Sequence, residues 1–279
     1  MAFKGEVKPN WCPGCGDYGL LSTTVKALET AGYLPHQVVI VSGIGCSSNF
    51  PHFTSAYGFH TVHGRALPAA MAIKLSNPDL KVIAVGGDGD GYGIGVGHLV
   101  HAIRRNIDIT YMVMNNQIYG LTLGQASPTS TLDHITTTTP QGVNENPINP
   151  ISLSLGCGST FTARGFSGKT KHLQELISKG MKHKGFSFID VLSPCVTFNK
   201  LNTYDYFKKR IYDLNQEQFD STNVIDAYQK SFEWNEKIPI GIFYQNKNSD
   251  FKPNFNPIEE KISFSNLQIE KEEIYDLFK

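Results

Sequence analysis

The chain has 279 residues, of which 40% are hydrophobic and 18% charged, as expected of a globular protein with a sizeable core. Lys plus Arg and Asp plus Glu number 25 each, so no net charge points to nucleic acid or an anionic membrane as a partner. No apolar run reaches the roughly 18 residues of a membrane span, and the first residues lack the apolar core of a signal peptide. We therefore expect a soluble, cytoplasmic protein.

Apolar runs alternate with helical patterns along the chain. The expected buried strands are 37–43, 81–87, 109–116 and 186–194, and the expected helices are 20–32, 66–77, 95–106 and 171–185. Strand–helix–strand repetition predicts an α/β fold, with a doubly wound, mostly parallel sheet covered by helices on both faces.

Two segments break this alternation. Residues 126–152 form a long polar stretch rich in Pro and Thr, which is typical of a lid or binding loop. From residue 199 the chain becomes charged, aromatic and rich in Asn. We expect a main domain over 1–198 and a C-terminal extension over 199–279 that packs on the core or on a partner, or is only partly ordered.

The stretch VGGDGDGYGIGVGHL at 85–99 joins an expected strand to an expected helix, where parallel sheets bind phosphate. The dinucleotide pattern of glycines at i, i+2 and i+5 fails at every register. The GKT at 168–170 fails as a phosphate loop because Ala163 stands where that loop needs glycine. These failures exclude both common nucleotide motifs.

Asp88 lies inside this glycine run, and a carboxylate beside a phosphate requires a bridging cation. Mg²⁺ takes one or two protein oxygens plus phosphate oxygens. Asn116 closes the next expected strand, 28 positions later, so the chain returns to the same edge of the sheet. Asp88, Asn116 and the carbonyl of Ile118 are therefore the expected magnesium ligands.

The five cysteines are an odd number, in a chain without secretion signals, which argues against a disulfide framework. Cys12 and Cys15 form a CxxC pair, and Cys46 and Cys195 follow at long spacings. From spacing alone, zinc and an iron–sulfur cluster are equally good interpretations. Cys157 has no partner spacing and is expected to be a small core residue.

Taken together, these motifs resemble one family. A GDG followed by NN, each ending a strand, is similar to the thiamine diphosphate motif, and the closer resemblance is to the β subunit of 2-oxoacid:ferredoxin oxidoreductases. It covers roughly residues 8–210 and rests on these segments: WCPGCGD (11–17), GIGCSS (43–48), HGRA (63–66), GGDGD (86–90), NNQIYGLTLGQASPTS (115–130) and SPCVTFN (193–199).

The resemblance implies a role for each matching residue and a thiamine diphosphate-binding fold. Gly89, Asp90, Gly120 and Leu121 match the residues that contact the diphosphate in the family. The magnesium ligands that the resemblance implies are the three residues named above. Positions lining the cofactor match Ile44, Gly45, Cys46, Ser47, His63, Gly64 and Arg65, with His63 and Arg65 as catalytic candidates. The four thiolates of a [4Fe–4S] cluster match Cys12, Cys15, Cys46 and Cys195. A cluster beside thiamine has a use as electron acceptor, which favours it over zinc.

The implied reaction is coenzyme A-dependent oxidative decarboxylation of a 2-oxoacid, with electrons passing through the cluster to ferredoxin. No glutamate occurs from Tyr33 to Asn144, which agrees with a separate α subunit supplying the glutamate that activates thiamine. The resemblance favours 2-oxoglutarate as substrate, although Asn49 and Leu123 stand where relatives often have basic residues, and pyruvate stays open.

Two other functions remain open from the sequence. One is a thiamine decarboxylase or synthase without redox chemistry. The other is a zinc-stapled scaffold subunit that has lost catalysis. An external acidic ferredoxin is expected to meet the basic residues near the cysteines, which are Lys4, Lys8, Lys200, Lys208, Lys209 and Arg210.

Overall fold

The structure is a computed structural model that describes residues 2–249. The part of the expected extension from 250 to 279 lies outside the described residues. One eight-stranded sheet runs through the described chain, with the strand order β2-β1-β3-β4-β6-β5-β8-β7. The strands are β1 (Val38–Ser42), β2 (Tyr57–His60), β3 (Lys81–Gly87), β4 (Thr110–Asn115), β5 (Phe161–Phe166), β6 (Ser187–Leu192), β7 (Ile211–Asp213) and β8 (Ile238–Gln245).

The sheet is mostly parallel. Moving across the sheet from β2 through β1, β3, β4 and β6 to β5, every pair of neighbouring strands is parallel. The strand β8 then runs antiparallel to β5 and parallel to β7. The helices are α1 (Asp17–Thr30), α2 (Ala66–Ser76), α3 (Val96–Arg105), α4 (Pro150–Gly156), α5 (Thr170–Lys182), α6 (Tyr204–Lys208) and α7 (Val224–Lys230). The predicted α/β class with a mostly parallel sheet is confirmed.

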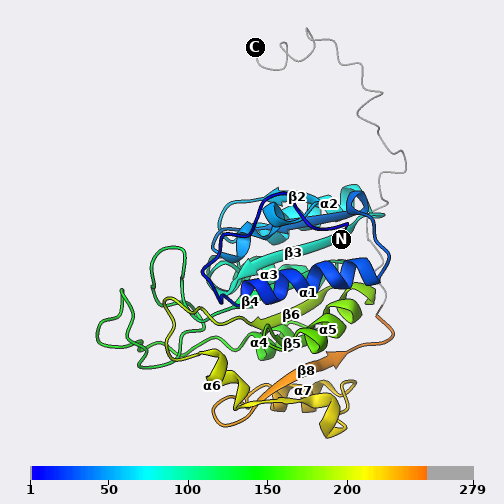
Figure 1. The fold of residues 1–279 in the computed structure, drawn as a ribbon. Helices are drawn as coiled ribbons and strands as arrows, with labels where there is room; N and C mark the ends of the chain where they lie inside the picture. Colours follow the sequence, from blue (N-terminus) through cyan, green and yellow to red (C-terminus); the bar gives the residue numbers. More distant parts are fainter. Residues whose placement is uncertain (1, 250–279) are drawn as a thin grey trace, which may run out of the picture.

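Helices cover both faces of the sheet (Figure 1). Val38 and Ile40 of β1 pack in one core with α1 and α5, and Val39 and Val41 pack in a second core with α2 and α3. Successive residues of a strand point to opposite faces, so a strand buried on both faces must be apolar throughout. This explains the continuous apolar runs in the sequence.

Several elements have no counterpart among the predictions, including β2, β5 and β8. The strand β8 lies in the expected extension and pairs with β5, so this part of 199–249 packs on the core. A domain boundary at residue 198 stays a prediction. No helix among residues 2–249 is long and apolar enough to span a membrane.

The arrangement of the central strands positions the expected site. In the β1–β3 and β3–β4 pairings, Ser42 lies opposite Val85 and Gly87 opposite Met114. The carboxyl ends of β1, β3 and β4 therefore meet at one edge of the sheet. The long segment between β4 and α4, drawn in green in Figure 1, lies beyond one end of the sheet.

Candidate active site at the carboxyl edge of the sheet

Asp88 follows β3 directly and is 1% exposed. The hydroxyls of Ser127 and Thr129 both donate to its Oδ2, at 2.6 Å each, which fixes the orientation of the carboxyl group. Burial raises the pKa of Asp88 to about 6, and the two hydroxyl hydrogen bonds oppose this rise. A cation at this position would favour the ionised form of Asp88.

Asn116 follows β4 on the neighbouring strand. Its Oδ1 accepts a hydrogen bond from the backbone N–H of Ile118 at 3.1 Å. Asp88, Asn116 and Ile118 line the same pocket. The structure thus brings together the three residues expected to bind magnesium.

The pocket is formed by three segments: the loop after β1, the β3 end, and the segment after β4. Its described lining residues are Ile44, Gly45, Cys46, Ser47, Gly87, Asp88, Gly89, Asp90, Asn116, Ile118, Tyr119, Gly120, Leu121 and Thr122. All the expected cofactor-binding positions are among them except His63, Gly64 and Arg65. A concave site with backbone from several segments suits a diphosphate.

A short π-helical turn, Gly89–Ile94, leads from Asp88 towards α3. The hydroxyl of Tyr119 donates to the carbonyl of Gly89 at 3.0 Å. A Cβ at Gly89 would overlap the Tyr119 ring, so only glycine allows this close approach. The tyrosine thereby holds the glycine loop against the segment that follows β4.

Asp90 is expected to contact the diphosphate, and its side chain connects the loop after β1 with the segment that carries His63 and Gly64. Its Oδ1 accepts the N–H of Ile44 at 2.9 Å and the N–H of Gly64 at 2.7 Å, and it lies 3.0 Å from Nδ1 of His63. Burial raises the pKa of Asp90, and the two backbone donors and His63 oppose the rise. A Cβ at Gly43 would overlap this carboxylate.

The HGR segment is placed in two different environments. His63 borders a hollow that it shares with Tyr119 and Thr122, next to the main pocket. Arg65 is exposed, and its Nη1 lies 3.0 Å from Nε2 of His98 on α3. The structure therefore places His63 in a hollow beside the pocket and leaves Arg65 at the outer surface.

Four of the five cysteines gather beside the pocket. A Cβ at Gly120 would lie 3.6 Å from Sγ of Cys46 and 3.8 Å from Sγ of Cys195. Cys15 interacts electrostatically with both of these, and Cys46 with Cys12. Residues more than 180 positions apart in the sequence thus meet in one place.

Hydrogen bonds fasten the segments that carry these cysteines. Gly16 donates its N–H to the carbonyl of Pro194 at 3.1 Å, and the Ser193 hydroxyl donates to Asp17 at 2.7 Å. The indole N–H of Trp11 donates to the carbonyl of Cys46 at 2.6 Å. The N-terminal CxxC is therefore held against both other cysteine segments.

Burial disfavours the thiolate form of Cys15 and Cys46. It raises the pKa of Cys46 to about 11, with Asp17 and neighbouring thiols adding to the rise, and it raises the pKa of Cys15 even further. Within residues 2–249, no group of three or more His, Cys, Asp or Glu side chains is arranged to hold a single metal ion. Cys157, at the end of α4, packs against the core of the opposite face.

Comparisons with known proteins agree with this geometry. The family model for the C-terminal TPP-binding domain of thiamine pyrophosphate enzymes matches residues 43–191, and the model for the C-terminal part of the pyruvate ferredoxin oxidoreductase beta subunit matches residues 195–260. The 2-oxoacid:ferredoxin oxidoreductase subunit beta of Saccharolobus solfataricus is 50% identical over 251 residues, which is 85% of this chain and 82% of that protein. The chain belongs to the family of 2-oxoacid:ferredoxin oxidoreductase β subunits.

Two further relatives extend the comparison. The subunit beta of 2-oxoacid:ferredoxin oxidoreductase 1 from Aeropyrum pernix is 44% identical over 89% of this chain and 81% of that protein. A solved 2-oxoglutarate:ferredoxin oxidoreductase from Magnetococcus marinus, with 2-oxoglutarate, coenzyme A and succinyl-CoA bound, superposes with a TM-score of 0.87 at 37% identity, covering 99% of this chain and 94% of that one.

Several site residues of this β subunit were not found from the sequence. Ser127 and Thr129 hold Asp88, and Tyr119 holds Gly89, yet none of them was expected to have a role. All three lie inside the NNQIYGLTLGQASPTS segment that carried the resemblance. The available signal was the Ser-Pro-Thr-Ser run at 127–130, which lies within the polar stretch expected to be a lid or binding loop.

Proposed function

We propose that this chain is the thiamine diphosphate-binding β subunit of an enzyme that converts a 2-oxoacid, coenzyme A and oxidised ferredoxin to acyl-CoA, CO₂ and reduced ferredoxin. The observation that carries this proposal is the pocket where Asp88 and Asn116, from adjacent strands, meet beside a cluster of cysteines. Membership of the oxidoreductase family supports it.

The residues present fit a magnesium ion bound to a diphosphate. Asp88, Asn116 and the Ile118 carbonyl would hold the ion, as hard oxygen ligands do. Two hydroxyls already orient the Asp88 carboxylate, so the ligand is preorganised. The backbone around Gly89 and Gly120 would hold the diphosphate. Thiamine, when bound, would supply a nucleophilic carbon for the 2-oxoacid and a cationic ring as the acceptor for the electron pair left by CO₂.

The cysteine residues fit a [4Fe–4S] cluster, which supplies one-electron carriage when bound. Cys12, Cys15, Cys46 and Cys195 would hold it. Burial makes thiolates at Cys15 and Cys46 unfavourable without a cationic centre. A single zinc ion requires four sulfurs about 2.3 Å from one point. A cluster beside thiamine has a use as electron acceptor, whereas zinc has none, which favours a cluster over zinc.

A partner subunit completes the proposed site. No glutamate is among the described residues that line the pocket, and thiamine activation needs a carboxylate. Lys and Arg are likewise missing from these lining residues, so recognition of a second substrate carboxylate would fall to the partner. We propose 2-oxoglutarate as substrate, supported by the Magnetococcus marinus structure, which binds it. The five unpaired thiols agree with a reducing cytoplasm.

The experiment is anaerobic co-purification with the α subunit, followed by dye-reduction assays with 2-oxoglutarate, pyruvate and 2-oxobutyrate. We expect coenzyme A-dependent reduction, fastest with 2-oxoglutarate, and four irons per β subunit. Protein without iron or sulfide that still decarboxylates would instead support a thiamine enzyme without redox function. Stoichiometric zinc without thiamine diphosphate binding would support an inactive scaffold.

The cluster assignment has a matched pair of variants. We expect Cys195→Ser to lose iron and the visible absorbance of the cluster. Cys157→Ser should keep both, since Cys157 directly follows α4 and packs against the opposite core. Equal iron content in the two variants would contradict the assignment of Cys195.

Ferredoxin docking is proposed at the basic residues near the cysteines. Lys4, Lys8, Lys200 and Lys208 are all exposed. Opposite charges accelerate encounter mostly at low salt. The double variant Lys4→Glu and Lys8→Glu is expected to slow ferredoxin reduction at low salt without changing reduction of a small dye. An unchanged ferredoxin rate would show that these two lysines have no steering role.

A further inference from the structure

A second pocket lies on the other side of the segment that follows β4. Its volume is about 300 Å³, at the lower end of the range for small-molecule sites. Asn115 and Gln117 line this pocket, whereas Asn116 and Ile118 line the thiamine pocket. The two pockets share no lining residue, so residues 115–118 form a wall between two separate sites.

Arg164 of β5 is the only charged residue among the described residues that line this second pocket. The side chain is 1% exposed, and its Nε donates to Asp190 Oδ2 at 3.1 Å. Its Nη1 is buried and has no hydrogen-bond partner among the described residues. A buried guanidinium nitrogen without an acceptor is costly, and bidentate carboxylates suit its geometry.

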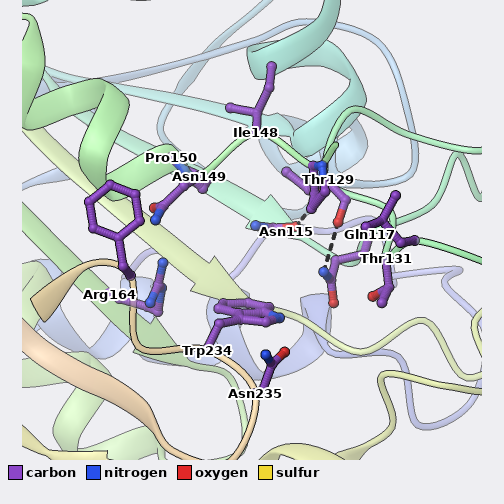
Figure 2. A pocket seen from close by; sticks show the side chains of 13 residues that line it. Asn115, Gln117, Thr129, Thr131, Ile148, Asn149, Pro150, Arg164, Trp234 and Asn235 are labelled. Atoms are coloured by element: carbon purple, nitrogen blue, oxygen red, sulfur yellow. Dashed lines mark hydrogen bonds between the residues drawn. The ribbon is translucent and has the colours of Figure 1, made fainter. Parts of the chain in front are cut away.

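Two further buried polar atoms at the pocket also lack hydrogen-bond partners within residues 2–249. They are Oε1 of Gln117 and Oγ1 of Thr131. The Gln117 amide nitrogen is engaged, since it donates to the Thr129 carbonyl at 2.8 Å. Figure 2 shows Gln117 and Thr131 on one side of the pocket and Arg164 on the other. Unpartnered groups thus stand on both sides of one pocket.

The remaining walls are largely apolar and aromatic. The Arg164 guanidinium lies 5.0 Å from the centroid of the Trp234 ring, and Figure 2 shows the two side chains next to each other. Phe232 also lines the pocket and is 60% exposed. Leu132 and Ile148 complete the apolar lining. These walls suit a short apolar or planar body.

We propose that this pocket binds a small monocarboxylate with an apolar or planar body, its carboxylate on Arg164. Asp190 already neutralises the guanidinium, so a monocarboxylate adds one buried negative charge, whereas a dianion such as phosphate adds two and carries the larger desolvation penalty. A carboxylate offers planar acceptor oxygens, which suit the unpartnered Nη1 of the planar guanidinium. The body of the ligand lies against Trp234 and Phe232.

The test uses the full chain in complex with its α subunit, with phenylacetate as probe and phenylacetamide as its neutral counterpart. We expect calorimetry to show saturable binding of phenylacetate and at least tenfold weaker binding of the amide. Saturating thiamine diphosphate and Mg²⁺ should not displace phenylacetate, because the pockets share no lining residue. Competition by thiamine diphosphate, equal affinity for the amide, or no saturable binding would each overturn the proposal.

Variants locate the probe. Arg164→Lys keeps the charge but loses the fork, and should weaken phenylacetate binding at least tenfold. Arg164 is buried, so if this variant does not fold, Phe232→Ala decides. Phe232 is exposed, so its loss should weaken binding about fivefold without affecting folding. The control Phe59→Ala, at another exposed phenylalanine on β2, should bind as the unaltered protein does. Equal affinity of Phe232→Ala and Phe59→Ala would overturn the proposal.

Discussion

The substitution Thr129→Val tests whether the hydroxyls around Asp88 prepare this carboxylate for metal binding. Thr129 is 2% exposed, and its hydroxyl lies 2.6 Å from Asp88 Oδ2 and 2.9 Å from Asn115 Oδ1. The hydroxyl has one proton, so it donates to only one of these acceptors at a time. Valine has nearly the same shape, so the substitution removes hydrogen bonding and leaves packing almost unchanged.

The size of the effect follows from this hydrogen bond. A hydrogen bond to a charged group contributes about 1.5–3 kcal/mol. Ser127 still donates to the same Oδ2 after the substitution and offsets part of the loss. We therefore expect Mg²⁺-dependent thiamine diphosphate binding to weaken by about 1.4 kcal/mol, which is tenfold in the dissociation constant.

The assay is titration of the cofactor into the purified αβ complex, with Mg²⁺ in excess. Thr24→Val is the matched control, because Thr24 is fully buried and its hydroxyl bonds only within α1 and to Met112. The control should bind the cofactor with unchanged affinity. Unchanged affinity in a folded Thr129→Val protein, or an equal loss in Thr24→Val, would refute the reasoning.

Two further predictions concern Gly89 and His183. Gly89→Ala places a methyl group in the Tyr119 ring, so titration should show at least tenfold weaker binding of thiamine diphosphate. The control Gly97→Ala, on α3 with open space around the added methyl group, should bind the cofactor with unchanged affinity. Burial lowers the pKa of His183 to about 4, below its unfolded value of about 6.5, so its stabilising effect is present above pH 6.5 and lost as the pH falls towards 4. Urea denaturation measures the free energy of unfolding at pH 7 and at pH 5. Between these two values the free energy should fall further in the unaltered protein than in His183→Gln, by at most about 2 kcal/mol. An equal fall in both proteins would exclude this contribution of His183.

The sequence by itself determined the central layer of the fold and the candidate magnesium ligands. Strands β1, β3, β4 and β6 lie within the expected runs, because strands buried on both faces must be continuously apolar. Asp88 and Asn116 were identifiable because they directly follow two such strands. Parallel strands joined by a helix bring their carboxyl ends to one edge, so position along the chain was enough to place both residues together.

Only the tertiary structure decided the contacts between segments far apart in the sequence. The strand β5 was missed because Arg164 interrupts its apolar pattern, and the side chain can be buried only because Asp190, on the neighbouring strand β6, accepts its hydrogen bond. In the same way, Thr129 approaches Asp88 only after a long segment folds back over the sheet edge. Periodicity reports which residues are buried, but pairing between distant polar groups depends on the path of the chain in space.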